Sequence, residues 1–173
     1  SAVHTINPQA VIYGEGWTGG TSALSGNKQA TQANIKQITV SDGAAGGVAV
    51  FNDVIRDGLK GSVFEHTGKG YINGAATSIN LSKVKFGIRG GTAPSPSGWT
   101  VNNAAIINYV SAHDNHTLWD KLEISCPENT VEERLAMNRL AAAVVMLSQG
   151  TPFMQAGEEM LRTKGGDENS YKS

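Results

Sequence analysis

Two short stretches of this chain carry side chains that could do acid–base chemistry. In the first, VIYGEGW, Glu15 stands between two glycines and is followed by Trp17. A carboxyl group beside an indole and apolar walls is poorly solvated, which favours its neutral, proton-donating form. The flanking glycines leave room for a bulky ligand, so the stretch predicts a proton donor with a flat ring beside it. Taken alone, the residues also fit a solvated loop glutamate with Trp17 in the core, which is the simpler interpretation.

The second stretch, SAHDNHTLW, sets His113, Asp114 and Asn115 side by side. An imidazole can donate to a hydroxyl group, and the neighbouring carboxylate can hold positive charge or further hydroxyls. A metal site is the alternative, but the sequence shows no second group of histidines or carboxylates at the spacing of zinc ligands. We therefore predict a polar site without a metal.

The remaining reactive side chains are interpreted as structural. We expect His116 to be exposed, and His4 and His66 to have surface or structural roles. Cys126, the single cysteine, cannot form an internal disulfide and lacks neighbours that would activate a thiol.

A further polar group is expected to lock a loop through an ion pair and helix caps, with a substrate role for Asn52 as the less favoured alternative. Its members are Asn52, Asp53, Arg56 and Asp57. Glu158 could face a site or be buried in hydrogen bonds, and the sequence leaves both open.

These groups follow short apolar runs that read as strands. The runs cover 10–13, 48–51, 105–110 and 152–156. They are continuous rather than alternating, which is typical of strands covered on both faces in parallel sheets. Polar residues follow each of the four runs, so we expect them to gather at one edge of the sheet.

Helices are expected between the runs, over about 52–60 and 79–86 and over 131–149. Thr130 and Glu133 predict a capping box at the start of the last helix, and Gly150 helps to end it. Its apolar stripe should continue through Leu140, Val144 and Leu147.

Alternating strands and helices predict an α/β fold. Chemistry at the carboxyl ends of several strands favours a (β/α)8 barrel, whose full length of about 250 residues makes four strands half a barrel. The chain is thus expected to form one partial catalytic domain over 1–173, as the second half of the barrel. An open doubly wound sheet fits the same pattern, although no phosphate-binding glycine motif is present.

Composition excludes several other classes. The net charge of −1 predicts no nucleic-acid partner, and 39% hydrophobic with 17% charged residues is ordinary for a folded domain. No apolar run approaches the about 20 residues of a membrane helix, and the first residues do not read as a signal peptide.

The motifs in their order resemble a known family. INPQAVIYGEGW and INYVSAHDNHTLWDKL resemble the fifth- and seventh-strand regions of the α-amylase superfamily. Together with FNDVIRDGLKGSVF and LSQGTPFMQAGEEMLRTKGGDENSYKS, they are similar to bacterial type I pullulanases specifically. The similarity runs from about residue 5 to the end of the chain.

This resemblance implies a retaining glycoside hydrolase of the TIM-barrel type that cleaves α-1,6 branch linkages of pullulan and amylopectin. It implies Glu15 as general acid and Asp114 as transition-state stabiliser. Implied substrate contacts are Trp17, His113, Asn115, Arg162, Asn169 and Tyr171. The family's nucleophile, an aspartate at the end of the fourth strand, has no match in this sequence, so the isolated chain is expected to be inactive.

The expected partners are an α-glucan substrate and the remaining half of the barrel. No cofactor is expected, with a structural calcium ion left open for the parent enzyme, and the resemblance suggests a secreted or cell-surface bacterial protein. Two alternatives stay open: an α-1,4-acting or dual-specificity enzyme of the same superfamily, and a non-catalytic carbohydrate-binding fragment.

Overall fold

The structure is a computed structural model that describes residues 2–41, 47–92, 98–100 and 102–172. Four parallel strands form one sheet in the order β1-β2-β3-β4. Their bounds are Ile12–Gly14, Val48–Asn52, Ile106–Asn108 and Thr151–Pro152. All neighbouring pairs are parallel, which confirms the predicted α/β class with crossover connections.

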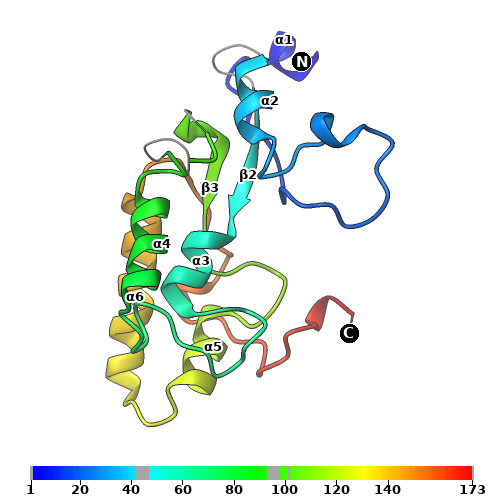
Figure 1. The fold of residues 1–173 in the computed structure, drawn as a ribbon. Coiled ribbons are helices and arrows are strands. Elements are labelled where there is room, and N and C mark those ends of the chain that lie inside the picture. The colour runs from blue at the N-terminus through cyan, green and yellow to red at the C-terminus, as the bar shows by residue number, and fades with distance from the viewer. Residues whose placement is uncertain (1, 42–46, 93–97, 101, 173) are drawn as a thin grey trace.

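Helices separate the strands along the chain. The α-helices are α1 (Ala2–Ile6), α2 (Ile35–Ser41), α3 (Asp53–Lys60), α4 (Ser78–Ile88), α5 (Leu118–Ser125) and α6 (Val131–Leu147). Four 3-10 turns accompany them, at Gly26–Lys28, Asn103–Ala105, Glu158–Met160 and Ser170–Lys172. In Figure 1, α3 to α6 lie together on one side of the molecule, whereas α1 and α2 lie at the far end of β2. None of the helices in the described ranges is long and apolar enough to cross a membrane.

The strand and helix predictions differ from the structure mainly at their ends. The first strand begins two residues later than expected, and the last is only Thr151–Pro152, although the Phe153 amide still donates to the carbonyl oxygen of Asn108 in β3. α5 was not predicted. It begins at Leu118 because the Thr117 side chain accepts a hydrogen bond from the amide of Asp120 and caps the helix.

The capping box of α6 is confirmed, because Thr130 and Glu133 exchange side-chain and backbone hydrogen bonds. The predicted apolar stripe is wrong in part: Leu140 and Leu147 are exposed, and α6 buries Ala141 and Val145 instead. The expectation that the strands are covered on both faces also fails for β1, where Tyr13 is 54% exposed. The exposed apolar side chains show that α6 and β1 each have a face which this chain does not cover.

The larger apolar core lies between the helices. Its buried members are Ile55, Leu59, Ile72, Val84, Val110, Leu118, Leu122, Ala141 and Val145. α3 and α4 approach closely because Gly87 lacks a side chain: a Cβ atom there would lie 2.4 Å from Cβ of Ile55. A second, smaller core on β2 and β3 contains Ile35, Val50, Ala105 and Ile106.

Two buried asparagines fix the end of the sheet from which the polar loops emerge. The Asn52 amide group donates to Oδ1 of Asn108 at 2.9 Å, and Oδ1 of Asn52 accepts from the Ile55 amide at the start of α3. Asn108 in turn donates to the carbonyl groups of Gly87 and Gln149. The ends of β2 and β3, the start of α3, the last turn of α4 and the segment after α6 are thereby held together.

Candidate functional site

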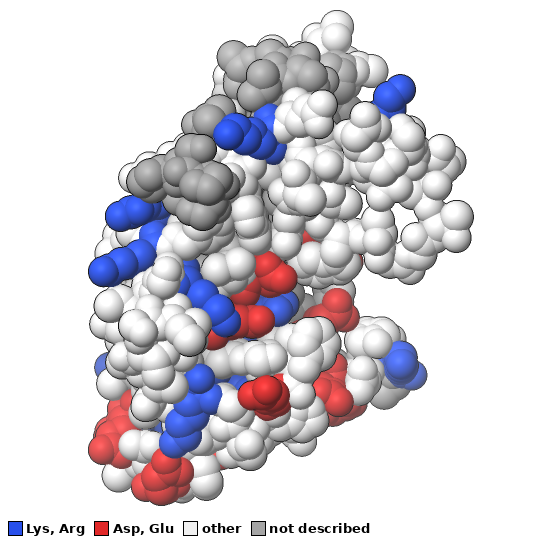
Figure 2. Space-filling view, in the orientation of Figure 1, with Lys and Arg blue, Asp and Glu red and all other residues white. Residues whose placement is uncertain are grey.

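A cavity of about 290 Å³ opens at the carboxyl edge of the sheet. Its lining comes from the ends of all four strands and from α3. The residues are Tyr13, Gly14, Glu15, Trp17, Phe51, Arg56, Lys60, Val63, Tyr109, Ser111, Ala112, His113, Asp114, Asn115 and Phe153. Figure 2 shows acidic side chains gathered around a hollow in the middle of one face. Polar residues that follow the strands in the sequence thus come together at this edge, as predicted.

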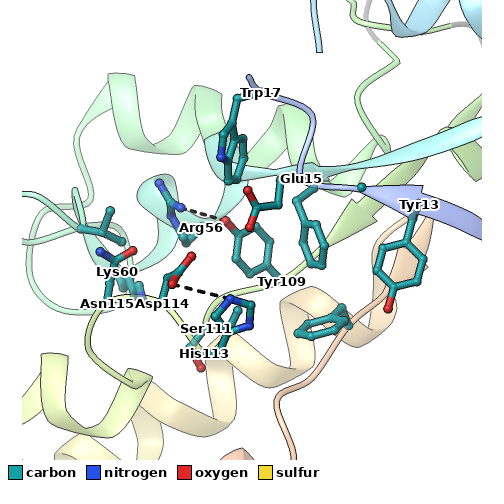
Figure 3. A pocket seen from close by; sticks show the side chains of 15 residues that line it. Tyr13, Glu15, Trp17, Arg56, Lys60, Tyr109, Ser111, His113, Asp114 and Asn115 are labelled. Carbon is teal, nitrogen blue, oxygen red and sulfur yellow. Dashed lines mark hydrogen bonds and ion pairs between the residues drawn. The ribbon is translucent and has the colours of Figure 1, made fainter. Parts of the chain in front are cut away.

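Glu15 and Asp114 face each other in this cavity, although 98 residues separate them in the sequence. Each offers a carboxylate oxygen, and His113 a ring nitrogen, with all three atoms within 4.8 Å of one another. The His113 ring is 3.6 Å from a carboxylate oxygen of Asp114. In Figure 3, Glu15 descends from the end of β1 toward Asp114 and His113, and Trp17 lies above it.

Gly16 sets the direction of the Glu15 loop. Its φ is +87°, and a Cβ atom added there would lie 2.8 Å from Cβ of Val50. The expectation that both glycines make room for a ligand is therefore wrong for Gly16, which lets the backbone turn and pack on β2. It holds for Gly14, where an added Cβ would meet nothing within 4 Å.

Glu15 does not lie in the apolar surroundings that the sequence suggested. Its side chain is exposed, and Trp17 is 43% exposed. Among the described residues, Glu15 is therefore a solvated carboxyl group at the edge of the cavity.

A wall of aromatic rings at the strand ends was missed by the sequence analysis. Phe51 packs edge-to-face on Tyr13, Tyr109 and Phe153, with ring centroids 4.9–5.8 Å apart. Each ring comes from a different strand end, and each apolar run carries one aromatic residue. That recurrence was the signal that could have predicted the wall.

Two buried basic side chains, Arg56 and Lys60, form a layer in the wall of the cavity. The Arg56 guanidinium donates to Asp57 at 2.7 Å and to the Tyr109 hydroxyl at 2.8 Å. Burial alone would lower the pKa of Arg56, but the hydrogen bond to Asp57 and the nearby Tyr109 raise it overall, so Arg56 remains charged. Burial raises the pKa of Tyr109 to about 12, so its hydroxyl group stays neutral. The predicted ion pair of Arg56 and the cap by Asn52 are both present.

Lys60 is the second cation of this layer and is only 2% exposed. Burial, together with the neighbouring Arg56, lowers the pKa of its amino group to about 7. Glu158 is also buried, and burial raises its pKa, while a 2.6 Å hydrogen bond from Ser111 opposes that shift. Of the two interpretations left open for Glu158, the structure favours buried hydrogen bonding behind the site.

Five of the eight predicted site residues line the cavity, namely Glu15, Trp17, His113, Asp114 and Asn115. Arg162, Asn169 and Tyr171 do not. Arg162 donates to the carbonyl oxygen of Ala156, Asn169 contacts Glu168, and Tyr171 is 56% exposed. The structure places these three in the C-terminal segment beside the cavity rather than in it, and their substrate role stays a prediction.

One prediction about the histidines is wrong and one is confirmed. His116 is only 5% exposed instead of being on the surface, because its ring lies under the C-terminal segment with Nε2 3.0 Å from the carbonyl oxygen of Gly166. The His66 side chain is 51% exposed and contacts Glu168 and the ring of His116, which fits the expected surface or structural role. Cys126 is buried, as a structural thiol should be.

Two groups in the described part of the chain could hold a metal ion by their geometry. One is the cavity group of Glu15, His113 and Asp114, and the other consists of His66, His116 and Glu168. The carboxyl groups of the first are also placed for proton transfer and charge stabilisation at a bound ligand. The second group lies outside the residues that line the cavity.

Sequence comparisons identify relatives over nearly the whole chain. The pullulanase of Bacillus subtilis (strain 168) is 37% identical over 172 residues, which is 96% of this chain and 22% of that protein. Chloroplastic pullulanase 1 of Arabidopsis thaliana is 34% identical over 94% of this chain and 20% of its own length. The chain thus spans about a fifth of the length of these relatives. No protein-family model matches it.

Solved structures give the same result. Pullulanase from Bacillus acidopullulyticus is 47% identical, with a TM-score of 0.84 over 98% of this chain and 19% of that protein. A variant of the Paenibacillus barengoltzii pullulanase complexed with maltotetraose is 41% identical, with a TM-score of 0.86 over 98% of this chain and 25% of that protein. The strands, helices and cavity edge described above therefore have counterparts in these enzymes.

Proposed function

The chain is a relative of one segment of the pullulanases, and on that premise we propose that it forms part of the catalytic domain of a starch-debranching glycoside hydrolase. Its substrates are the α-1,6-glucosidic branch linkages of pullulan, amylopectin and related α-glucans. The single observation that carries the proposal is the meeting of Glu15 and Asp114 in one cavity at the carboxyl ends of the strands. The maltotetraose complex of a related pullulanase supports a glucan as the ligand.

We place the chain as the second half of a (β/α)8 barrel, strands five to eight. The consecutive order β1-β2-β3-β4 supports this, since a doubly wound sheet reverses its strand order at a switch point. β1 and β4 are the outer strands, and both edges would pair with the other half of the barrel. The exposed apolar side chains of α6 would be buried in the same assembly.

The polar cavity residues would divide the chemistry among them. Glu15 protonates the glycosidic oxygen as the bond to the anomeric carbon breaks, and an aspartate from the other half of the barrel attacks that carbon and forms a covalent glycosyl-enzyme. Glu15, now a carboxylate, then takes a proton from a water molecule that displaces the aspartate, so that two inversions give net retention. Asp114 stays ionised and offsets the positive charge of the oxocarbenium-like transition state. His113 and Asn115 donate to or accept from sugar hydroxyl groups.

Trp17 and the aromatic wall provide flat apolar surfaces on which sugar rings lie. Arg56 holds the Tyr109 hydroxyl from behind at 2.8 Å, so the wall keeps its shape when the ligand arrives. Closure by the other half of the barrel would desolvate Glu15 and favour its protonated form. Arg162, Asn169 and Tyr171 would contact more distant sugars from the C-terminal segment.

The product pattern of the complete enzyme tests this function. Cleavage of pullulan at its α-1,6 bonds releases maltotriose, whereas α-1,4 cleavage gives other trisaccharides. We expect maltotriose, identified by chromatography against authentic standards. An enzyme that binds pullulan but releases no maltotriose would favour the α-1,4-acting alternative, and binding without any product would favour the carbohydrate-binding fragment.

A further inference from the structure

Three side chains with metal-binding atoms meet beside the catalytic cavity, although they are distant in the sequence. His66 lies in the connection between α3 and α4, His116 lies just before α5, and Glu168 lies in the C-terminal segment. One ligand atom of each lies within 4.8 Å of the others. Two imidazoles and a carboxylate are a ligand set that suits zinc and similar ions.

Two direct contacts hold the three side chains together. Nε2 of His66 lies 2.9 Å from Oε2 of Glu168, and the two imidazole rings pack edge-to-face with their centroids 4.8 Å apart. The side chain of His66 is 51% exposed, so an ion can reach the group from solvent. A surface ion pair would involve only His66 and Glu168, whereas here the imidazole of His116 also packs against His66.

His116 also has the outer contact that a metal-binding histidine usually has. Its Nε2 lies 3.0 Å from the carbonyl oxygen of Gly166, which can only accept, so Nε2 carries the hydrogen. The lone pair of the neutral ring is then on Nδ1. Histidine ligands commonly donate their second ring N–H to such a carbonyl group, which fixes the tautomer and the ring orientation.

The segment that carries Glu168 is held in place independently of the three side chains. Asp120 of α5 accepts hydrogen bonds from the Thr163 hydroxyl group and, at 2.8 Å, from the Lys164 amide. Lys164 also donates to the carbonyl oxygen of His113 at 3.0 Å. The group is therefore assembled by the fold and not by chance rotamers of an isolated loop.

We propose that His66, His116 and Glu168 form a binding site for a divalent transition-metal ion of the Zn²⁺ type. With bonds of about 2.0–2.1 Å, a tetrahedral zinc ion holds its ligand atoms about 3.3 Å apart. The His66–Glu168 contact would open by a few tenths of an ångström and the longer separations would close, which small side-chain rotations achieve. Water takes the fourth position.

Such an ion would join three segments around the cavity. His116 is two residues from Asp114, and Glu168 is next to Asn169, so the metal would hold the C-terminal segment against the loop that carries Asp114. Because the ion binds the folded arrangement and not the separated ligands, it stabilises the folded protein. The site does not depend on the proposed glycosidase activity.

The test is a zinc titration of the complete, metal-stripped protein by calorimetry, with thermal unfolding as a second readout. We expect one binding event and a rise in Tm when zinc is added. His66→Gln and Glu168→Gln each remove a ligand. Loss of an outer-shell partner typically lowers metal affinity by about 10–100-fold, so the Kd for zinc should rise by more than that in each variant. Neither variant should show the rise in Tm with zinc.

His113→Gln is the matched control, since it removes a ligand from the other metal-capable group and leaves this one intact. Its zinc affinity should equal that of the parent protein. Both ligand variants change partly exposed side chains, and equal Tm values without zinc show that they fold. Absence of zinc binding in the parent, unchanged affinity in the ligand variants, or loss of binding in His113→Gln would each overturn the proposal.

Discussion

The two carboxyl groups in the cavity owe their positions to the backbone conformation of the residues that follow them. Glu15 points into the cavity because Gly16 adopts a positive φ that packs the following turn onto Val50. Asp114 lies on the opposite side and is followed by Asn115, which itself has a φ of +61°. A left-handed asparagine costs little because its short polar side chain tolerates this region. Backbone conformation therefore directs both carboxyl groups.

At the residue scale, we predict that Glu15→Gln in the complete enzyme loses turnover and retains its substrate. Glutamine has the same shape but no proton to give, so kcat on pullulan should fall by about 10²–10⁴-fold, the usual share of a general acid. KM should change little, because the interaction that is lost belongs to the transition state. Steady-state kinetics with reducing-sugar detection measure both.

Glu132→Gln serves as the control, because Glu132 is an exposed carboxylate in the first turn of α6. It should leave kcat unchanged. A Glu15→Gln enzyme that retains more than about a tenth of the parent kcat would contradict the role of Glu15 as general acid.

The elements hold the site through close packing as well as through buried hydrogen bonds. α3 begins at the cavity and carries Arg56 and Lys60, and it packs on α4 at the point where Gly87 faces Ile55. The same Gly87 carbonyl accepts from Asn108, which holds the end of β3. Gly87 therefore takes part both in the contact between α3 and α4 and in the hydrogen bond that holds the end of β3.

At the element scale, Gly87→Ala should destabilise the fold by about 1–3 kcal/mol, the usual cost of overpacking. The added Cβ would lie 2.4 Å from Ile55, so α3 and α4 must separate. Alanine alone would favour the helix by about 1 kcal/mol, and the clash must exceed that gain. The midpoint of urea unfolding measures the difference.

Ser82→Ala is the matched variant, since Ser82 is an exposed residue of the same helix. Its effect should stay within about 0.5 kcal/mol of the parent. Equal stability of the Gly87→Ala and Ser82→Ala proteins would show that the helices do not need the glycine contact.

At the scale of the whole molecule, segments that are far apart in the sequence contact each other. The C-terminal segment lies along the loop before α5 through Asp120, His116 and the backbone of His113. In Figure 1 this segment leaves the helices and ends beside the lower part of the fold. Its position decides where Arg162, Asn169 and Tyr171 lie relative to the cavity.

At the scale of the whole molecule, Asp120 should make stability depend on acid pH. Burial alone would raise its pKa, but hydrogen bonds from Thr163 and Lys164 lower it overall below the usual 3.8. A depressed folded-state pKa means that the stabilisation is present above pH 3.8 and is lost as the pH falls through the folded-state pKa. Asp120→Asn should lose about 1.5–3 kcal/mol at neutral pH, since it removes hydrogen bonds to a charged acceptor.

Urea unfolding at steps from about pH 5 to about pH 2 measures this dependence. The difference between the parent and Asp120→Asn should shrink toward the acid end of that range. Glu123→Gln, an exposed carboxylate of the same helix, should follow the parent throughout. A constant difference between the parent and Asp120→Asn at every pH would refute a depressed pKa for Asp120.

Local sequence determined most of the strands and helices, and it also determined that most of the predicted site residues lie at the carboxyl edge of the sheet. Apolar runs, the Thr130–Glu133 capping box and the polar residues behind each strand are short-range signals, and the helices at 53–60, 78–88 and 131–147 follow from them. Five of the predicted site residues share a cavity because parallel strands present their carboxyl ends at one edge.

Tertiary structure alone decided burial and long-range partners. The burial of His116, its meeting with His66 and Glu168, and the exposure of Leu140 and Leu147 depend on which segments pack together. The members of this group lie about fifty residues apart in the sequence. Irregular loops set the distances between them in space, so the sequence alone does not predict that they meet. The same holds for the aromatic wall, whose rings touch only once the four strands are side by side.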